Sequence, residues 1–139
     1  MVHEGQPSEG TAMASSLHTL AERVHRRGLV ILFSDFLDEM DTVSSALSHF
    51  RRRGHDVVVY HILDRTEVEF PFRETGCFVD MESGERVVAT PREIREGYRR
   101  EVKDFCQRCH QICTTLGADY HLALTDEKIV ELLLRHWGK

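Results

Sequence analysis

The sequence lacks any apolar run of the roughly 18 residues that a membrane-spanning helix needs. Its first ten residues are polar, with glycine, proline and serine among them, so they do not have the apolar core of a signal peptide. We expect neither a signal peptide nor a membrane span in this chain. Residues 1–10 are predicted to form a flexible lead-in, because they show no hydrophobic periodicity.

Cysteine is also scarce, and the charge balance is acidic. The chain has 4 cysteines without the spacing of a disulfide framework, which favours a reducing compartment, and we expect a cytoplasmic protein. It has 18 Lys and Arg against 23 Asp and Glu, a net charge of -5, which argues against nucleic acid as the partner. The one dense basic run, 51–53, precedes a glycine and is typical of a helix C-terminus.

The hydrophobic pattern predicts an α/β fold, with an open, mainly parallel sheet and helices on both faces. Continuous apolar runs indicate buried strands near 29–34, 57–63 and 118–124, and we expect these to be parallel neighbours in that order. Apolar residues at helical spacing predict helices over 12–27, about 43–53, 90–116 and from about 125 to the C-terminus; the first three end next to Gly28, Gly54 and Gly117. Residues 64–76 look irregular, and an inserted β-hairpin is predicted around residues 82–84.

The first candidate site follows the strand near 29–34. Ser34, Asp35 and Asp38 come at its carboxyl end, where ligands gather in open α/β sheets. Two carboxylates there would suit Mg²⁺, which prefers oxygen ligands. The alternative is that one of the two aspartates caps the next helix. Both interpretations are open on the sequence pattern alone.

The second candidate is a set of zinc-binding side chains on one side of the helix predicted over 90–116, namely Cys106, Cys109, His110 and Cys113. Cys77 or His121 could complete the set. Consecutive turns of one straight helix cannot easily surround a tetrahedral ion, so we favour buried thiols that pack on the sheet. We expect these thiols to be reduced and largely buried, with less than one equivalent of zinc.

Other conspicuous residues have simple structural explanations. His61 and His121 alternate with apolar residues inside predicted strands, which indicates packed or edge positions. Phe70 and Phe72 flank a proline, and we favour packing against the core over an exposed docking feature. There is no phosphate-binding loop and no dinucleotide-binding fingerprint.

Three segments together resemble the bacterial family catalogued as domain of unknown function 58, whose members carry a von Willebrand factor A-like domain. They are RRGLVILFSDFLD at 26–38, RRGHDVVVYHILD at 52–64 and EFPF at 69–72. The likeness extends over residues 11–139, which would form a partial domain of this kind, equivalent to the second half of the Rossmann-type sheet. The resemblance therefore implies the same α/β fold that the hydrophobic pattern predicts.

The resemblance also implies part of a metal-ion-dependent adhesion site. Asp35 matches the aspartate that follows the fourth strand in that superfamily, and Thr11 matches its threonine. The Asp-x-Ser-x-Ser loop and the first three strands have no counterpart here, so the chain resembles a domain that begins partway through. With Thr11 and Asp35 alone we expect an incomplete metal site and no cofactor, Mg²⁺ binding only if the missing loop is supplied.

For function, the resemblance implies a protein-interaction module that is not an enzyme by itself. Such proteins are typically encoded beside a MoxR-type AAA+ ATPase, with which they are thought to assemble or mature other proteins. Ser34, Asp35 and Asp38 would face the partner. The alternative is a small metal-dependent hydrolase or phosphoryl-transfer protein that uses Asp35 and Asp38. A strand left bare at the sheet edge would also favour a homodimer.

Overall fold

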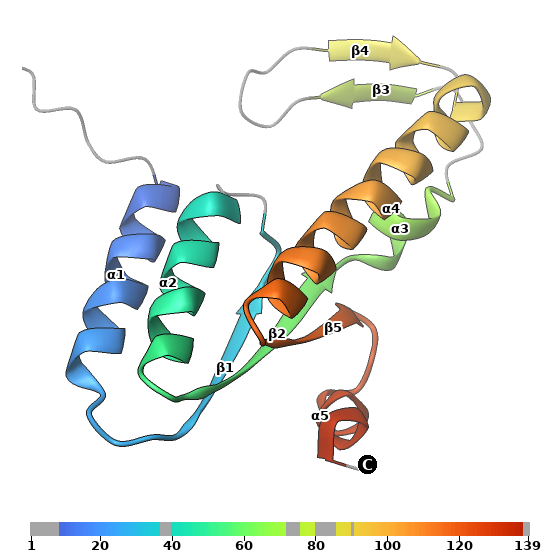
Figure 1. Cartoon of the computed structure of the whole chain (residues 1–139). Helices are drawn as coiled ribbons and strands as arrows, with labels where there is room; N and C mark the ends of the chain where they lie inside the picture. Colours follow the sequence, from blue (N-terminus) through green and yellow to red (C-terminus); the bar gives the residue numbers. More distant parts are fainter. Residues whose placement is uncertain (1–8, 37–39, 72–75, 80–85, 90, 138–139) are drawn as a thin grey trace, which may run out of the picture. The chain divides into compact units, whose positions relative to one another are not determined.

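The computed structural model of the chain describes residues 9–36, 40–71, 76–79, 86–89 and 91–137. Within these residues the elements follow one another as helix, strand, helix, strand, short helix, hairpin, long helix, strand and helix (Figure 1). Their bounds are α1 Glu9–Arg23, β1 Leu29–Ser34, α2 Met40–Arg52, β2 Asp56–Leu63, α3 Arg65–Glu69, β3 Gly76–Val79, β4 Arg86–Ala89, α4 Pro91–Thr115, β5 Asp119–Leu124 and α5 Ile129–Trp137.

The chain divides into two compact units. The first unit comprises Met1–Ile62 and Arg108–Ala123, and therefore contains β1, α2 and most of β2 and β5. The second unit comprises Leu63–Gln107 and Leu124–Lys139, which include α3, the hairpin and α5. The long helix α4 contributes residues to both units.

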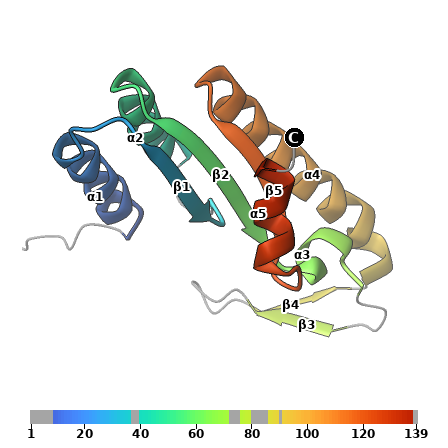
Figure 2. The same ribbon diagram turned by 90° about the horizontal axis from the view of Figure 1, so that it is seen from below.

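The open sheet is parallel and has the strand order β1-β2-β5, as the sequence predicts (Figure 2). Strands β1 and β2 pair in parallel from Leu29 opposite Asp56 to Ser34 opposite His61. The parallel direction follows from the connection through α2, which returns the chain to the same end of the sheet. The expected α/β class and the expected order of the three strands are confirmed.

The core of the first unit forms where α2 covers the sheet. The apolar residues of α2 at helical spacing are all buried: Val43, Ala46, Leu47 and Phe50. Residues 57–60 of β2 are buried too, which explains why both of its alternating faces are apolar. Helix α1 packs alongside α2.

The ends of two helices are set by glycine, as predicted. Gly54 follows α2 with φ 84° and Gly117 follows α4 with φ 72°, a left-handed conformation that side chains with a Cβ rarely adopt. The basic run ends α2: Arg51 donates to the carbonyl of His55 over 2.8 Å and lies 3.3 Å from the carboxylate of Asp56. The interpretation of the basic run 51–53 as a helix C-terminus is therefore confirmed.

Several boundaries differ from the sequence prediction. Helix α1 runs from Glu9 to Arg23 rather than over 12–27, and α5 begins at Ile129 rather than near residue 125. The segment 64–76 was expected to be irregular, but it contains α3, which begins with a capping box: Asp64 accepts from the backbone N–H of Thr66, and Glu67 accepts from that of Asp64. A helix of five residues is too short to show hydrophobic periodicity, so only the capping signal was available.

The predicted hairpin is confirmed. Strands β3 and β4 pair antiparallel, from Gly76 opposite Ala89 to Val79 opposite Arg86. Just before it, Phe70 is buried and its ring lies 4.8 Å from that of Tyr98, so this phenylalanine packs against the core of the second unit. Phe72 lies outside the described residues.

None of the helices in the described ranges is both long and apolar enough to cross a bilayer.

Candidate functional site

The candidate site of the first unit is a sharp turn at the carboxyl end of β1. Ser34 ends the strand, and its Oγ accepts a hydrogen bond of 3.1 Å from the backbone N–H of Phe36. Phe36 has φ 55°, a left-handed conformation that is unusual for an aromatic residue, yet its side chain is buried. Between them Asp35 remains exposed. The turn therefore directs one carboxylate-bearing residue outward while its neighbours are fixed.

A buried histidine holds this turn from the adjacent strand. His61 is fully buried in β2, and its Nε2 lies 3.1 Å from the carbonyl oxygen of Asp35. Because a carbonyl oxygen can only accept, Nε2 carries the hydrogen and donates it. The other ring nitrogen, Nδ1, lies 2.7 Å from the hydroxyl of Tyr120 on β5, which donates to it when the ring is neutral. A relay of two hydrogen bonds thus runs from β5 through β2 to the Asp35 backbone.

Aromatic packing closes the space around this relay. The ring of Phe36 meets the His61 ring edge-on at 5.2 Å, and the Tyr120 ring does the same at 5.9 Å. His110 of α4 contacts Tyr120 from the helix side at 5.3 Å. Both hydrogen bonds are part-buried, and inside such a packed shell they are stronger than in water and hold one geometry. Asp35 is therefore presented on a rigid support.

The structure brings together only some of the predicted site residues. Ser34 and Asp35 share the turn, but the Ser34 oxygen is engaged with the backbone of Phe36. Asp38 lies outside the described residues. Thr11 falls within α1, and its side chain is likewise outside what the structure describes. The residues that support this turn, and that the sequence prediction did not connect with it, are His61 and Tyr120, whose contacts depend on strand pairing.

The residues described here do not fit a magnesium site. Among them there is no group of three or more His, Cys, Asp or Glu side chains that could hold a metal ion. Asp35 is the only carboxylate on the described part of the turn, 34–36, and a single carboxylate binds Mg²⁺ weakly, because the ion then keeps most of its waters. The described part of the turn therefore presents one exposed carboxylate-bearing residue, Asp35.

Comparison with known proteins places the chain in a family. The family model described as "Protein of unknown function DUF58" matches residues 1–108, which is well over half of the sequence. The chain belongs to this DUF58 family. The family resemblance predicted from three short segments is therefore confirmed, while the family description itself gives no function. Searches of curated proteins and of solved structures returned no match.

In this DUF58 chain the three cysteines of α4 lie as the favoured packing interpretation predicts. Cys109 and Cys113 are fully buried, Cys106 is partly buried, and none of the three is in a disulfide. His110 is exposed and contacts Tyr120, while His121 stacks on Tyr60 at 5.2 Å. The side chain of Cys77 lies outside the described residues. Burial raises the pKa of the Cys113 thiol to about 11 from its ordinary 9.0.

Slow thiol labelling is the expected consequence. A pKa raised from 9.0 to about 11 lowers the reactive thiolate fraction of Cys113 roughly 100-fold near neutral pH, and burial slows access further. In native buffer we expect a maleimide reagent to modify Cys106 first and to leave Cys109 and Cys113 largely unmodified, as measured by peptide mass spectrometry. Unfolded protein is the control. Equal labelling of all three, or zinc released in stoichiometric amount on labelling, would contradict the packing interpretation.

A second cluster of polar residues, in the second unit, was not predicted. It ties the turn after β2 to the turn after β5. Thr125 donates from its backbone to the Leu63 carbonyl over 3.0 Å and from its hydroxyl to Asp64 over 2.8 Å. Arg65 reaches both carboxylate oxygens of Asp126, at 2.6 and 3.2 Å. We call this set, residues 63–65 with 125–126, the strand-end latch.

Hydrogen bonds lower the pKa of both carboxyl groups of the latch. Those from Thr66, which follows the latch in α3, and from Thr125 lower the pKa of Asp64 below its ordinary 3.8, and the Arg65 guanidinium lowers that of Asp126. A lowered pKa in the folded state stabilises the fold above the ordinary value, and this contribution is lost as the pH falls through the lowered value. The latch is therefore intact at neutral pH and fails in acid.

We expect the thermal midpoint to fall as the pH drops below about 4, the ordinary pKa range of aspartate. Asp126→Asn should lower the thermal midpoint at pH 7. It should also reduce the fall of the midpoint in acid, because the variant lacks one of the carboxylates that must be protonated. Glu101→Gln, the same loss of charge at an exposed carboxylate of α4, is the control. Thermal melts at several pH values measure the effect. An equal fall of the thermal midpoint in acid for wild type and Asp126→Asn would contradict a role of the latch in stability.

Proposed function

We propose that this DUF58 chain is a protein-interaction module whose partner contacts the Asp35 turn. The observation that carries the proposal is the support under this turn: His61 and Tyr120 use part-buried hydrogen bonds to fix the backbone, while Asp35 itself stays exposed. A preorganised group loses little conformational freedom on binding, which favours recognition. An exposed, rigidly held carboxylate suits a basic side chain or a metal ion carried by the partner.

The family resemblance supplies the candidate partner, a MoxR-type AAA+ ATPase, with which the chain would act in the assembly or maturation of other proteins. Ser34 and Asp38 would lie beside the contact, by their positions in the sequence. The proposal assigns no catalytic residue to the chain. The competing proposal is a metal-dependent hydrolase based on Asp35 and Asp38, and the experiment below separates the two.

Binding to the AAA+ ATPase encoded beside the gene tests the proposal. Asp35→Asn removes the charge and keeps the size, so we expect the affinity measured by calorimetry to fall about tenfold or more. Asp41→Asn, an exposed aspartate in the first turn of α2, is the matched control and should bind as the wild type does. Equal affinities for Asp35→Asn and wild type would contradict the proposed contact.

The same proteins test the competing proposal. An occupied metal site stabilises the fold by mass action, so millimolar Mg²⁺ or Mn²⁺ would raise the thermal midpoint. A rise that Asp35→Asn abolishes, together with hydrolysis of a phosphate ester, would favour the hydrolase. We expect no such rise for the chain alone, because one carboxylate binds Mg²⁺ weakly.

A further inference from the structure

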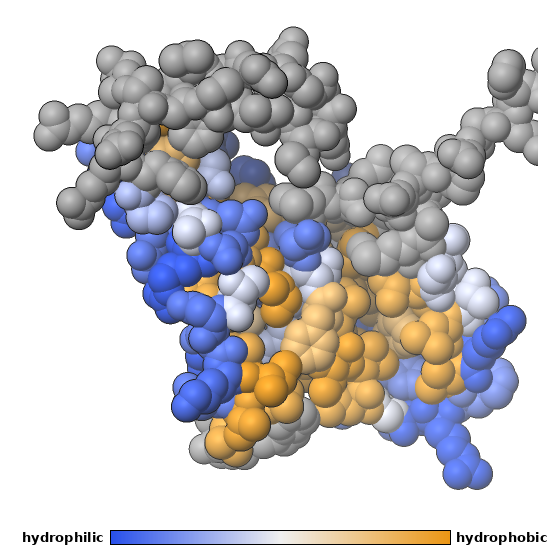
Figure 3. Space-filling model, turned by 180° about the vertical axis from the view of Figure 1, so that it is seen from behind, coloured by the Kyte–Doolittle hydropathy of each residue, from blue (hydrophilic) through white to orange (hydrophobic). Residues whose placement is uncertain are grey.

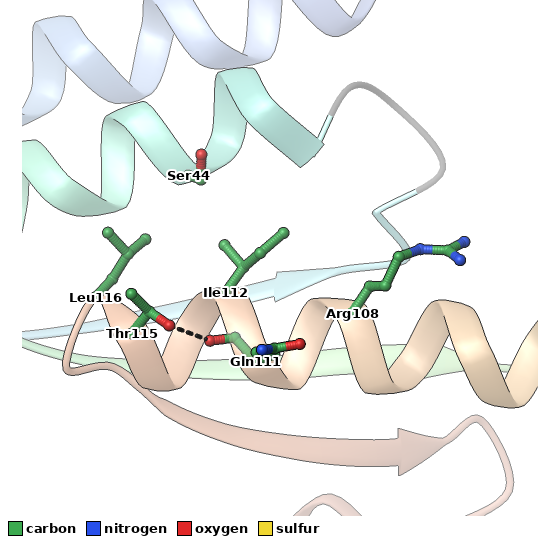
Figure 4. Close-up of a pocket in the computed structure, with 6 residues that line it drawn as sticks. All are labelled: Ser44, Arg108, Gln111, Ile112, Thr115 and Leu116. Carbon is green, nitrogen blue, oxygen red and sulfur yellow. Dashed lines mark hydrogen bonds between the residues drawn. The ribbon is translucent and has the colours of Figure 1, made fainter.

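A groove between α2 and the C-terminal turns of α4 is not used by the proposed function. Its volume is about 370 Å³, and all of its lining residues belong to the first unit (Figure 4). They come from two helices: Ser44 from α2, and Arg108, Gln111, Ile112, Thr115 and Leu116 from α4 or the residue after it.

The floor of the groove is apolar. Ile112 and Leu116 are one helical turn apart, and both point toward α2 in Figure 4. Each is only partly buried, so apolar surface remains accessible to another molecule. Branched aliphatic side chains at this spacing, with solvent-accessible surface, form a receiving surface for other aliphatic side chains.

One end of the groove carries a positive charge. Arg108 lies one turn before Ile112, is exposed, and extends past the floor residues (Figure 4). Within the described ranges no carboxylate pairs with its guanidinium. None of the six lining residues is acidic, although the whole chain has a net charge of -5. The groove is therefore locally complementary to a negative group.

The two hydroxyl groups of the lining already donate their hydrogens within their own helices. Thr115 donates to the Gln111 carbonyl over 2.8 Å, and Ser44 donates to the Asp41 carbonyl over 2.8 Å. They can still accept hydrogen bonds but have no hydrogen left to donate. Recognition in the groove would therefore depend on the apolar floor and on Arg108.

We propose that this groove binds an amphipathic helix of a partner protein, with two aliphatic side chains against Ile112 and Leu116 and one carboxylate against Arg108. The three receiving residues recur every four positions, which spans about 12 Å along α4. A partner helix presents side chains from one face with the same repeat, so a charge followed by two apolar groups matches the groove in order and spacing. The proposal does not depend on the Asp35 turn.

The test uses a fluorescein-labelled, lactam-bridged helical peptide that presents Glu, Leu and Leu at positions i, i+4 and i+8. We expect saturable binding by fluorescence anisotropy and amide shift changes at Ser44, Ile112 and Leu116 by NMR. Arg108→Glu should weaken binding about tenfold, and a peptide with Lys in place of Glu should recover affinity for that variant. Arg100→Glu, an exposed arginine elsewhere on α4, makes the same charge change and should bind normally.

Further variants separate this groove from other surfaces. Ser44→Trp should fill the groove and prevent binding, while circular dichroism confirms the fold. Asp35→Asn should leave peptide binding unchanged, so the proposals for the groove and for the Asp35 turn are tested independently. Absence of shift changes at millimolar peptide, or equal affinity of wild type and Arg108→Glu, would overturn the proposal. So would a change in self-association, rather than peptide binding, caused by Arg108→Glu.

Discussion

Replacement of His61 by Leu is expected to lower the free energy of unfolding by about 2–4 kcal/mol, since it leaves two polar partners without a bond in a packed region. His61 is fully buried and bonds the Asp35 carbonyl on one side and the Tyr120 hydroxyl on the other. Leucine fills a similar volume, so the loss reports the hydrogen bonds rather than a cavity. Urea unfolding followed by circular dichroism measures it.

Two milder variants divide the effect between the two bonds. His61→Gln keeps an N–H group near the position of Nε2, and it should retain most of the hydrogen bond to Asp35. Tyr120→Phe removes one hydroxyl and should cost about 1 kcal/mol. If His61→Leu were as stable as the wild type, the relay would contribute nothing to holding the turn.

The same variants connect stability to the proposed function. Without the bond from His61, the left-handed Phe36 has less support, and the Asp35 turn should relax. We expect His61→Leu to shift the amide resonances of Asp35 and Phe36. We also expect it to lower the affinity for the AAA+ ATPase, even at temperatures where the protein is folded. Tyr120→Phe should show smaller changes of the same kind.

The sequence predicts the framework of this fold because its signals are local. The apolar run at 29–33 is continuous, the apolar residues of α2 follow a helical repeat, and glycine ends two helices. Asp35 is predicted as a site residue for the same reason, since it directly follows a strand in an open α/β sheet. Such signals need only neighbouring residues to be interpreted.

The support under the turn is not predictable in this way. His61 is expected to be packed inside a strand, and it is, but its bond to Asp35 depends on the register that places Ser34 opposite His61. Tyr120 is 59 positions away from His61 and reaches it only because β5 lies next to β2. A single sequence does not give the register of strand pairs, so the partners of a buried histidine cannot be deduced from it.

The strand-end latch shows the same limit. Arg65 and Asp126 are 61 positions apart, and in sequence each has a local explanation as part of a helix start or a turn. Only the neighbouring positions of β2 and β5 bring the two turns within bonding distance. Long-range pairing therefore determines the candidate sites, whereas local pattern determines the elements that carry them.

The exposed side of β1 leads to the second large prediction, self-association. In the part of the chain that the structure describes, β1 is an edge strand, with β2 on one side and no strand on the other. Leu29 and Phe33 lie on one face of it, and each is 45 % exposed. The Phe33 ring stacks on Tyr60 at 5.0 Å and so extends an aromatic row toward the edge. Apolar side chains also gather on the surface seen in Figure 3.

An apolar edge without charge or proline is a template for another strand, because its backbone N–H and C=O groups are available for pairing. No residue of 29–33 is charged or proline. We propose that two copies pair along β1 about a two-fold axis, which lets the same residues of both copies meet. Exposed apolar residues at the centre of such an interface contribute most of its affinity.

We therefore expect sedimentation equilibrium to show a dimer of the wild type at micromolar concentration, and the double substitution Leu29→Lys with Phe33→Lys to weaken it about 100-fold or more. Two lysines on each copy would bring like charges together across the two-fold axis. The matched control is Val130→Lys with Leu134→Lys, which places the same charges on the exposed apolar residues of α5 and should leave the dimer intact. A wild type that stays monomeric at its highest soluble concentration, or equal dissociation of both double variants, would contradict pairing through β1.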